Sequence, residues 1–188
     1  ELSGTIDESI RHAVTKLSLI HLVSNEDAAK RIRGMGEDGT NIHVIGSPEL
    51  DLIDQNDLPT IEEVRKRYEI PFSKYAVCLY HPVTTEIQNL EEYASGIADA
   101  LEISGKNFVI IESNNDPGHE IIRRKFAKLR SSKNFRFLPS MRFEYYIALL
   151  KNSEFLIGNS SSGVREAPYM GIPAINLGSR QNGRNESS

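Results

Sequence analysis

The sequence predicts an α/β protein with one nearly complete doubly wound domain and the tail of a second. Two observations lead to this prediction. Short apolar runs, typical of buried strands, alternate with segments of helical periodicity, which is the order expected of parallel strands joined by crossover helices. The alternation stops once, over residues 47–60, which are poor in regular pattern and rich in Asp and Pro. We therefore expect residues 1–46 and 61–188 to belong to different Rossmann-like domains, joined by a linker.

The segment 1–46 has the pattern of the C-terminal part of a domain. A helix is expected over residues 7–16, because apolar side chains recur there at helical spacing. The β-like run 19–23 follows. A helix over 25–35 begins with Asn, a common N-cap residue, and the run 41–45 has the composition of a short strand.

The segment 61–188 continues the same alternation. Strands are expected at residues 75–80, 107–111, 135–138, 154–157 and 173–177. Helices are expected at residues 61–68, 86–104, 119–131, 142–152 and 163–170. Thr84 or Thr85 is the expected cap of the second of these helices, and Gly171 is a C-cap candidate for the last. The chain stops without a helix to cover its last strand, so we expect a piece of a two-domain protein that lacks this C-terminal helix.

The composition argues against several classes of function. The formal net charge of -4 opposes a general nucleic-acid binder, which needs concentrated positive charge. No apolar run approaches the roughly 20 residues of a membrane span. The single cysteine, Cys78, lies inside an apolar run and predicts a buried thiol in a reducing compartment, the cytoplasm. The sequence has no Cys/His metal-binding pattern and no Walker A loop, so we expect no metal site.

The most informative segment is the Gly-Ser loop, residues 158–168, which reads GNSSSGVREAP. It follows an apolar run and is expected to contain a helix N-terminus, where backbone N–H groups and small side chains favour a phosphate. Ser160, Ser161 and Ser162 serve as phosphate ligands and helix caps in this interpretation; covalent catalysis by one of them is less favoured, because no nucleophile-elbow motif is present. Glu166, one turn further, is placed to accept hydrogen bonds from ligand hydroxyls.

Two other loops also follow strands, where ligands of open α/β sheets bind. His81 comes directly after the strand 75–80; it either transfers a proton or contacts a phosphate, or it only orders the turn before Pro82. Arg180 and Arg184 follow the last strand and either neutralise a diphosphate or form a solvated surface pair.

The first predicted helix carries a dense group of titratable residues. Spacing puts Glu8, Arg11 and His12 near one face, opposite the apolar stripe, with Asp7 at the start of the helix. The group is either an acid/base cluster or a charged, solvated helix start, and spacing alone favours the second interpretation.

Four motifs in order resemble a known family, the UDP-N-acetylglucosamine 2-epimerases, and in particular its hydrolysing branch, which feeds sialic acid synthesis. The motifs are ELSGTIDESIRHAVTK, HPVTTE, GNSSSGVREAP and PAINLGSRQNGR, which together span nearly the whole chain. The resemblance implies the GT-B architecture, with two Rossmann-like domains around a cleft. It also implies conversion of UDP-GlcNAc to N-acetylmannosamine (ManNAc) and UDP, by anti-elimination to 2-acetamidoglucal followed by hydration, without a cofactor.

The same resemblance assigns expected roles to residues. Ser160, Ser161, Ser162 and Gly163 belong to the loop that holds UDP, with the first two serines on the diphosphate. Glu166 would bind the ribose hydroxyls and Arg180 would lie close to the nucleotide. Catalytic roles would belong to residues of both domains, namely Glu1, Asp7, Glu8, Arg11, His12 and His81, although the resemblance does not say which carboxylate is the base. The family tends to form dimers or tetramers, which is the expected oligomeric state.

Three alternatives remain open at this point. The substrate is UDP-GlcNAc or a related UDP-diacetamido sugar. A GT-B glycosyltransferase shares the fold, but it has no need of the cluster over residues 7–12. A nucleotide-sugar-binding module without catalysis is the third alternative. Because the family's first domain supplies further active-site residues, we expect residues 1–188 alone to be inactive.

Overall fold

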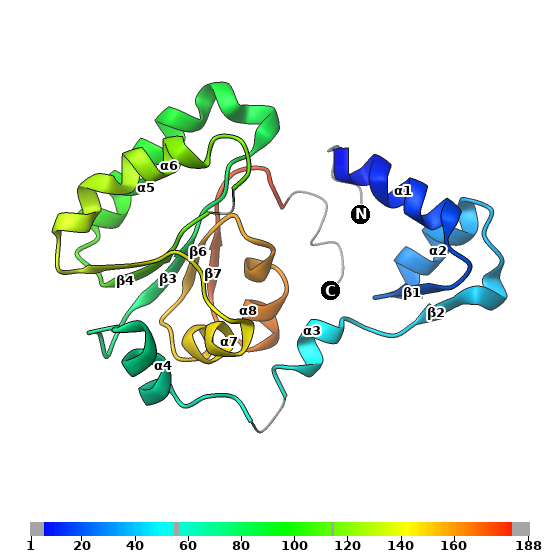
Figure 1. Ribbon diagram of the computed structural model, residues 1–188, viewed down its shortest axis with the longest axis horizontal. Coiled ribbons are helices and arrows are strands. Elements are labelled where there is room, and N and C mark those ends of the chain that lie inside the picture. The colour runs from blue at the N-terminus through cyan, green and yellow to red at the C-terminus, as the bar shows by residue number, and fades with distance from the viewer. Residues whose placement is uncertain (1–5, 55–56, 114, 182–188) are drawn as a thin grey trace. The chain divides into compact units, whose positions relative to one another are not determined.

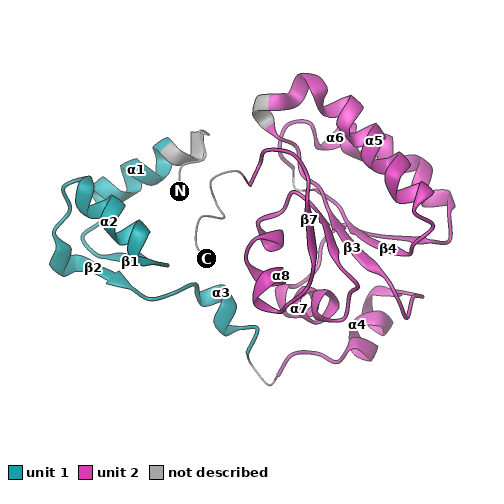
Figure 2. Cartoon of the chain, turned by 180° about the vertical axis from the view of Figure 1, so that it is seen from behind, with its two compact units in different colours: residues 1–55, 182–188 teal, residues 56–181 magenta. Residues whose placement is uncertain are grey.

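The computed structural model describes residues 6–54, 57–113 and 115–181, and of residues 6–8, 84 and 85 it describes only the backbone. The chain divides into two compact units, one formed by residues 1–55 with 182–188 and the other by residues 56–181 (Figure 2). The boundary lies inside the stretch rich in Asp and Pro, which also contains a short helix, α3 (Pro48–Asp51).

The described part of the second unit has one sheet of five parallel strands, in the order β5-β4-β3-β6-β7. The strands are β3 (Ala76–Leu79), β4 (Phe108–Ile111), β5 (Phe135–Leu138), β6 (Leu156–Gly158) and β7 (Ala174–Asn176). The strand order runs outward from β3 in one direction and then in the other, so the topological switch point lies between β3 and β6. This is the doubly wound α/β arrangement, and the predicted fold class is confirmed.

Helices cover both faces of this sheet (Figure 1). On one face lie α5 (Leu90–Ile103) and α6 (His119–Phe126), and on the other lie α4 (Ile61–Tyr68), α7 (Phe143–Lys151) and α8 (Glu166–Tyr169). All four residues of β3 and of β4 are buried, as expected for central strands with helices on both sides. Side chains of β3, α5 and α6 form a common core, among them Cys78, Leu90, Leu101, Ile122 and Phe126.

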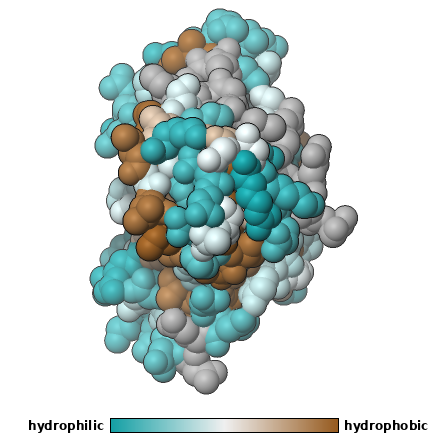
Figure 3. Space-filling view, turned by 90° about the vertical axis from the view of Figure 1, so that its right-hand side faces the viewer, coloured by the Kyte–Doolittle hydropathy of each residue, from teal (hydrophilic) through white to brown (hydrophobic). Residues whose placement is uncertain are grey.

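In its described part, the first unit pairs two parallel strands, β1 (His21–Val23) and β2 (Ile42–Val44). The helix α2 (Glu26–Gly34) packs on them through Ala29, and its N-cap, Asn25, accepts a hydrogen bond from the amide of Ala28 at 2.8 Å. The preceding helix is α1 (Ile6–Leu17). Apolar side chains of this unit are exposed, including Leu17, Leu19, Ile20, Leu22 and Val44. Figure 3 shows apolar patches between hydrophilic ones on one face of the molecule.

Most predicted elements are present within one or two residues of their expected bounds, but three helices differ. The helix expected from Glu86 begins as a 3-10 segment, η2 (Thr84–Asn89), because the Glu86 backbone is non-helical there, and α5 starts only at Leu90. The N-cap position is Val83 in η2 and Asn89 in α5, so the predicted Thr84 or Thr85 cap is wrong. The helix expected over 119–131 ends as α6 at Phe126 and continues as the 3-10 segment η3 (Ala127–Ser131).

The predicted helix over residues 163–170 is also wrong. A 3-10 turn, η4 (Ser161–Gly163), precedes the four-residue α8 instead. Pro168 explains the difference: it lacks the amide that a helix starting at Gly163 would need at this position, and proline fits only the first turn of a helix. At the other end, Gly171 (φ +70°) follows the C-cap residue Met170, and the amide of Ile172 bonds back to the Ala167 carbonyl at 2.8 Å.

Candidate functional site

The candidate site lies where the carboxyl ends of β3 and β6 meet, at the switch point of the sheet. Leu79 pairs with Gly158 in the strand register, and the Asn159 amide donates to the Leu79 carbonyl at 3.0 Å. Gly158 has a φ of +146°, and a Cβ at this position would lie 1.8 Å from the Leu79 carbonyl oxygen. Only glycine therefore lets β6 approach the β3 backbone this closely at the point where the Gly-Ser loop begins.

The Gly-Ser loop is held by hydrogen bonds within itself. The Ser160 Oγ accepts from the Ser162 amide at 3.3 Å, and the Ser160 carbonyl accepts from the Gly163 amide at 3.1 Å. The Val164 amide donates to the Ser161 carbonyl at 3.0 Å. These N–H groups do not point outward as the sequence predicts for a helix N-terminus. The three serines of the loop line the pocket beside it, so their side chains are groups that the loop offers to a ligand.

A pocket of about 430 Å³ opens beside this loop. Four loops at the carboxyl edge of the sheet contribute to it, together with α7 and α8. Its lining residues are Leu79, His81, Ile111, Glu112, Ser113, Pro139, Ser140, Met141, Phe143, Tyr146, Ser160, Ser161, Ser162 and Glu166. Five of the predicted site residues therefore surround one cavity: His81, the three serines and Glu166.

Two buried polar groups face each other across the base of the loop. The Tyr146 hydroxyl on α7 and the Ser162 hydroxyl lie 2.5 Å apart, and both side chains are buried. Burial raises the pKa of Tyr146, with a further contribution from the nearby Glu166 carboxylate, against the opposing effect of the hydrogen bond with Ser162. The phenol consequently stays neutral over the whole physiological pH range, and either hydroxyl can donate to the other.

Glu166 is an unusual member of the pocket lining. Its side chain is buried, and among the described residues its Oε2 has no hydrogen-bond partner. A buried carboxylate oxygen without a donor is costly, and such groups in native structures usually have a partner, which is a protein group, an ordered water or a bound ligand. The arrangement favours a ligand with hydroxyl or amide donors at this end of the pocket.

His81 follows β3 and lines the pocket, as the sequence predicts for a residue after a strand. Its backbone is held by Asn159: the Asn159 Oδ1 accepts from the His81 amide at 2.7 Å, and the Asn159 Nδ2 donates to the His81 carbonyl at 2.8 Å. The half-buried imidazole can bind an anion or exchange a proton with a ligand in the pocket.

The loop after β7 contacts Asn159 at the start of the Gly-Ser loop, but none of its described residues lines the pocket. The Asn159 carbonyl accepts from the Arg180 Nη1 at 3.2 Å and from the Gln181 Nε2 at 2.8 Å. The Ser179 hydroxyl donates to the Glu86 carboxylate, which ties this loop to the segment after β3. Arg184 lies outside the described residues.

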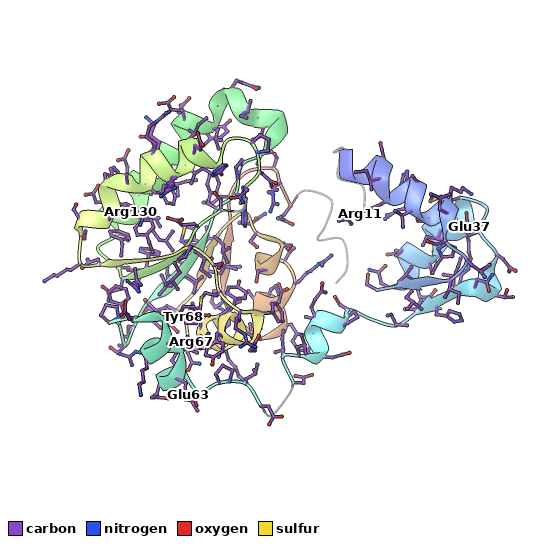
Figure 4. The ribbon with its side chains drawn as sticks, viewed as in Figure 1. Arg11, Glu37, Glu63, Arg67, Tyr68 and Arg130 are labelled. Carbon is purple, nitrogen blue, oxygen red and sulfur yellow. The ribbon has the colours of Figure 1, made fainter. Side chains whose placement is uncertain are left out.

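The remaining predicted site residues belong to the first unit. Glu1 lies outside the described residues, and Asp7 and Glu8 are on α1 with their side chains not described. Arg11 and His12 are exposed on the same helix, and Figure 4 labels Arg11 there. The predicted site residues of the second unit thus lie together around one pocket. Those on α1 belong to the first unit.

Sequence reasoning missed the parts of the pocket that come from β4, β5 and α7. Glu112 and Ser113 follow β4, and Pro139 to Met141 follow β5. The rule that ligands bind beyond the carboxyl ends of strands would have found both loops if applied to all strands. Tyr146 and Phe143 carry no such signal, because aromatic residues in an apolar helix are typical of a core.

No group of three or more His, Cys, Asp or Glu side chains in the described ranges is arranged to hold a metal ion. Within the same ranges, no helix has the length and apolar character to cross a membrane.

Sequence comparisons identify relatives along the whole chain. A family model described as UDP-N-acetylglucosamine 2-epimerase matches residues 1–188. A Neisseria meningitidis protein named UDP-N-acetylglucosamine 2-epimerase is 50% identical over 98% of this chain and 48% of its own length. A Legionella pneumophila protein named UDP-N,N'-diacetylbacillosamine 2-epimerase (hydrolyzing) is 34% identical over 100% of this chain and 50% of its own length. The chain spans about half the length of these relatives.

Comparisons of structure agree on the fold. A Staphylococcus aureus protein solved with UDP superposes with a TM-score of 0.69 at 17% identity, over 95% of this chain and 47% of that one. A Methanocaldococcus jannaschii UDP-GlcNAc 2-epimerase in complex with UDP-GlcNAc and UDP gives a TM-score of 0.62 at 20% identity, over 86% of this chain and 46% of that one.

Proposed function

Because the chain belongs to the UDP-N-acetylglucosamine 2-epimerase family, we propose that it forms the UDP-holding part of a hydrolysing UDP-GlcNAc 2-epimerase. In this proposal the protein removes the C2 proton of the sugar, breaks the C1–O bond and releases UDP, which leaves 2-acetamidoglucal. Water then adds to the glycal with the opposite stereochemical outcome at C2, and ManNAc is the product. The reaction needs no metal or redox cofactor.

The observation that carries the proposal is the buried Glu166 carboxylate in the pocket, with an oxygen that no described group satisfies. The ribose of UDP offers two neighbouring hydroxyls, which match a carboxylate acceptor. A hydrogen bond to a charged acceptor contributes about 1.5–3 kcal/mol, so this one contact accounts for a large part of nucleoside recognition.

The diphosphate belongs next to the ribose, against the serine hydroxyls of the Gly-Ser loop. Ser160 and Ser161 line the pocket together with Ser162, whose hydroxyl is already engaged by Tyr146. His81 supplies the imidazole of the pocket lining. Its proposed role is to contact the diphosphate or to transfer a proton. Arg180, whose Nη1 bonds the Asn159 carbonyl, completes the charge balance of the leaving UDP in this proposal.

The residues that act on the sugar belong to the first unit in this proposal. Glu1, Asp7, Glu8, Arg11 and His12 supply the acids and bases, and the proposal does not assign the C2 base to one carboxylate. Support comes from the density of titratable groups on α1, where the Arg11 and His12 side chains are exposed. A homo-oligomer and a cytoplasmic location are part of the same proposal, and the location is supported by the single cysteine of the chain, a buried free thiol.

The test is a product analysis with the full-length protein that carries this chain. Incubation with UDP-GlcNAc is expected to release free ManNAc and UDP in equal amounts, measured by chromatography against standards. Accumulation of UDP-ManNAc without free ManNAc would mean reversible epimerisation without hydrolysis. Binding of UDP with no turnover of either kind would favour a nucleotide-sugar-binding module.

The names of two relatives suggest a second candidate substrate. The Legionella pneumophila protein and a Campylobacter jejuni protein, 30% identical to this chain, are both named as hydrolysing epimerases of diacetylbacillosamine nucleotides. The relative at 50% identity is named for UDP-GlcNAc, and this higher identity favours UDP-GlcNAc here. Parallel assays with UDP-GlcNAc and UDP-N,N'-diacetylbacillosamine would decide between the two through the ratio of their kcat/KM values.

A further inference from the structure

Asn159 forms a buried bridge between the carboxyl ends of β3 and β6. Its side chain is fully buried and bonds both backbone groups of His81, accepting from the amide at 2.7 Å and donating to the carbonyl at 2.8 Å. A carboxamide that pairs with the N–H and the C=O of one residue fixes both peptide planes beside that residue. The direction in which the His81 side chain leaves the backbone is thereby fixed as well.

The backbone of Asn159 is held independently of its side chain. Its amide donates to the Leu79 carbonyl at 3.0 Å, and its carbonyl accepts from Gln181 at 2.8 Å and from Arg180 at 3.2 Å. The Gln181 side chain is itself buried. Asn159 therefore connects the segments after β3, β6 and β7 through hydrogen bonds.

Asn159 is not exposed to the pocket that it supports. Its exposed fraction is 0%, and the pocket is lined on either side of it by His81 and Ser160. Direct contact between the Asn159 side chain and a bound nucleotide is excluded by this burial.

We propose that Asn159 is a positioning residue that sets the direction of the His81 imidazole into the pocket, and that it acts on the reaction only through His81. The role of His81 in the reaction rests on the proposed function; the positioning of His81 by Asn159 does not. Misplacement of a reacting group by about 1 Å costs on the order of 100-fold in rate, so a lost bridge is expected to lower kcat more than it changes KM.

The first experiment uses the wild-type protein and needs no activity. The His81 amide is expected to exchange with solvent at least about 100-fold more slowly than an unprotected amide, because its N–H donates a hydrogen bond to the buried Asn159 Oδ1. NMR or mass spectrometry of exchanging amides gives this rate. Exchange at the unprotected rate would overturn the proposal.

The second experiment compares variants of Asn159 with a matched control. Asn159→Asp keeps the acceptor for the His81 amide and loses the donor to its carbonyl, and Asn159→Ser loses both without adding charge. Asn107→Asp is the control. Asn107 also donates from its Nδ2 to a backbone carbonyl, that of Lys74 at 3.0 Å, but it lies at the amino end of β4, away from the carboxyl ends that form the site. The NMR signals of the His81 imidazole are expected to shift in both Asn159 variants and not in the control. Unchanged His81 signals in a folded variant would overturn the proposal, and if neither variant folds, the exchange rate of wild type decides.

The third experiment is a double-mutant cycle in the full-length protein. Asn159→Ser is expected to lower kcat about 10- to 100-fold with less than about a threefold change in KM. In a His81→Gln background the same substitution is expected to lower kcat by less than about threefold, because the group through which it acts is gone. Equal losses in both backgrounds would show a general structural effect and overturn the proposal. If wild type releases no ManNAc, the proposed function fails, and the two experiments that do not measure activity still decide the role of Asn159.

Discussion

The Tyr146 hydroxyl on α7 bonds the Ser162 hydroxyl in the Gly-Ser loop at 2.5 Å, and both side chains are buried. One helix of the sheet's outer layer thus holds the loop that we propose binds the diphosphate. Because Ser162 is engaged in this way, Ser160 and Ser161 are the more available hydroxyls of the pocket lining.

Tyr146→Phe is expected to lower the free energy of unfolding by about 1–3 kcal/mol, because the Ser162 hydroxyl is left buried without its partner. UDP affinity should fall at the same time, since the loop is no longer held. Urea denaturation and calorimetry with UDP measure the two effects. Tyr145→Phe on the same helix is the control, because among the described residues its ring packs against Tyr68 and its hydroxyl has no hydrogen bond to the loop, so its UDP affinity should match wild type. An unchanged stability of the Tyr146 variant would contradict the importance of the bond.

Gly158→Ala is expected to destabilise the protein by about 3 kcal/mol or more, because the added Cβ would lie 1.8 Å from the Leu79 carbonyl oxygen at the point where β3 and β6 pair. Gly171→Ala is the matched control. Gly171 also has a positive φ, of +70°, but nothing lies within 4 Å of its Cβ position, so only the left-handed backbone penalty of about 1–2 kcal/mol applies. Thermal melting of both variants compares them. Equal losses would show that the close approach at Gly158 does not matter.

The sequence predicted the sheet better than the loops that form the site. The strand predicted over 107–111 matches β4 because a short apolar run between polar segments is typical of a buried strand, and all four residues of β4 are buried. Composition alone predicts the Gly-Ser loop, but helical spacing alone misplaces the helix that follows it, because spacing does not include the restriction that Pro168 imposes on the backbone. The bridge from Asn159 to His81 spans 78 positions of sequence, and no local pattern predicts such a pair. The same holds for the Tyr146 partner of Ser162, which only the packing of α7 against the sheet brings into contact.

Cys78 is expected to be unreactive in the folded protein. It is fully buried in β3, and burial raises the pKa of its thiol to about 12, so at pH 8 the thiolate fraction is on the order of 10⁻⁴. The folded state therefore binds the thiol proton more tightly than the unfolded state, in which the thiol has a pKa of about 8.5. Stability from this group is complete below that pH and is lost as the pH rises toward the folded value. A colorimetric thiol reagent at pH 8 should label the protein only after denaturation; rapid labelling without denaturant would contradict the burial of Cys78.

Glu166→Gln is expected to weaken UDP binding by roughly 10- to 100-fold, the equivalent of one charged hydrogen-bond acceptor. Wild type should show a comparable loss when UDP is replaced by 2′,3′-dideoxy-UDP, and the variant should lose little more with that ligand. Calorimetry with the two nucleotides gives all four affinities. The control is Glu92→Gln, a substitution at an exposed position of α5, which should leave every affinity unchanged. A variant that still discriminates between the two nucleotides would place the ribose elsewhere.

Residues 1–188 by themselves are expected to bind UDP and to release no ManNAc. The pocket residues that we assign to the nucleotide all lie in the second unit, whose sheet has helices on both faces.

The described part of the first unit has only a two-stranded sheet, and sheets of this size need further strands or packing for stability. Its exposed apolar side chains, among them Leu17 and Leu22, show that this part leaves much of its apolar surface uncovered. Calorimetry with UDP and a ManNAc release assay, each on this chain and on the full-length protein at equal concentration, measure the difference. Clear turnover by residues 1–188 would refute the prediction and would mean that α1 and the second unit together suffice for the chemistry.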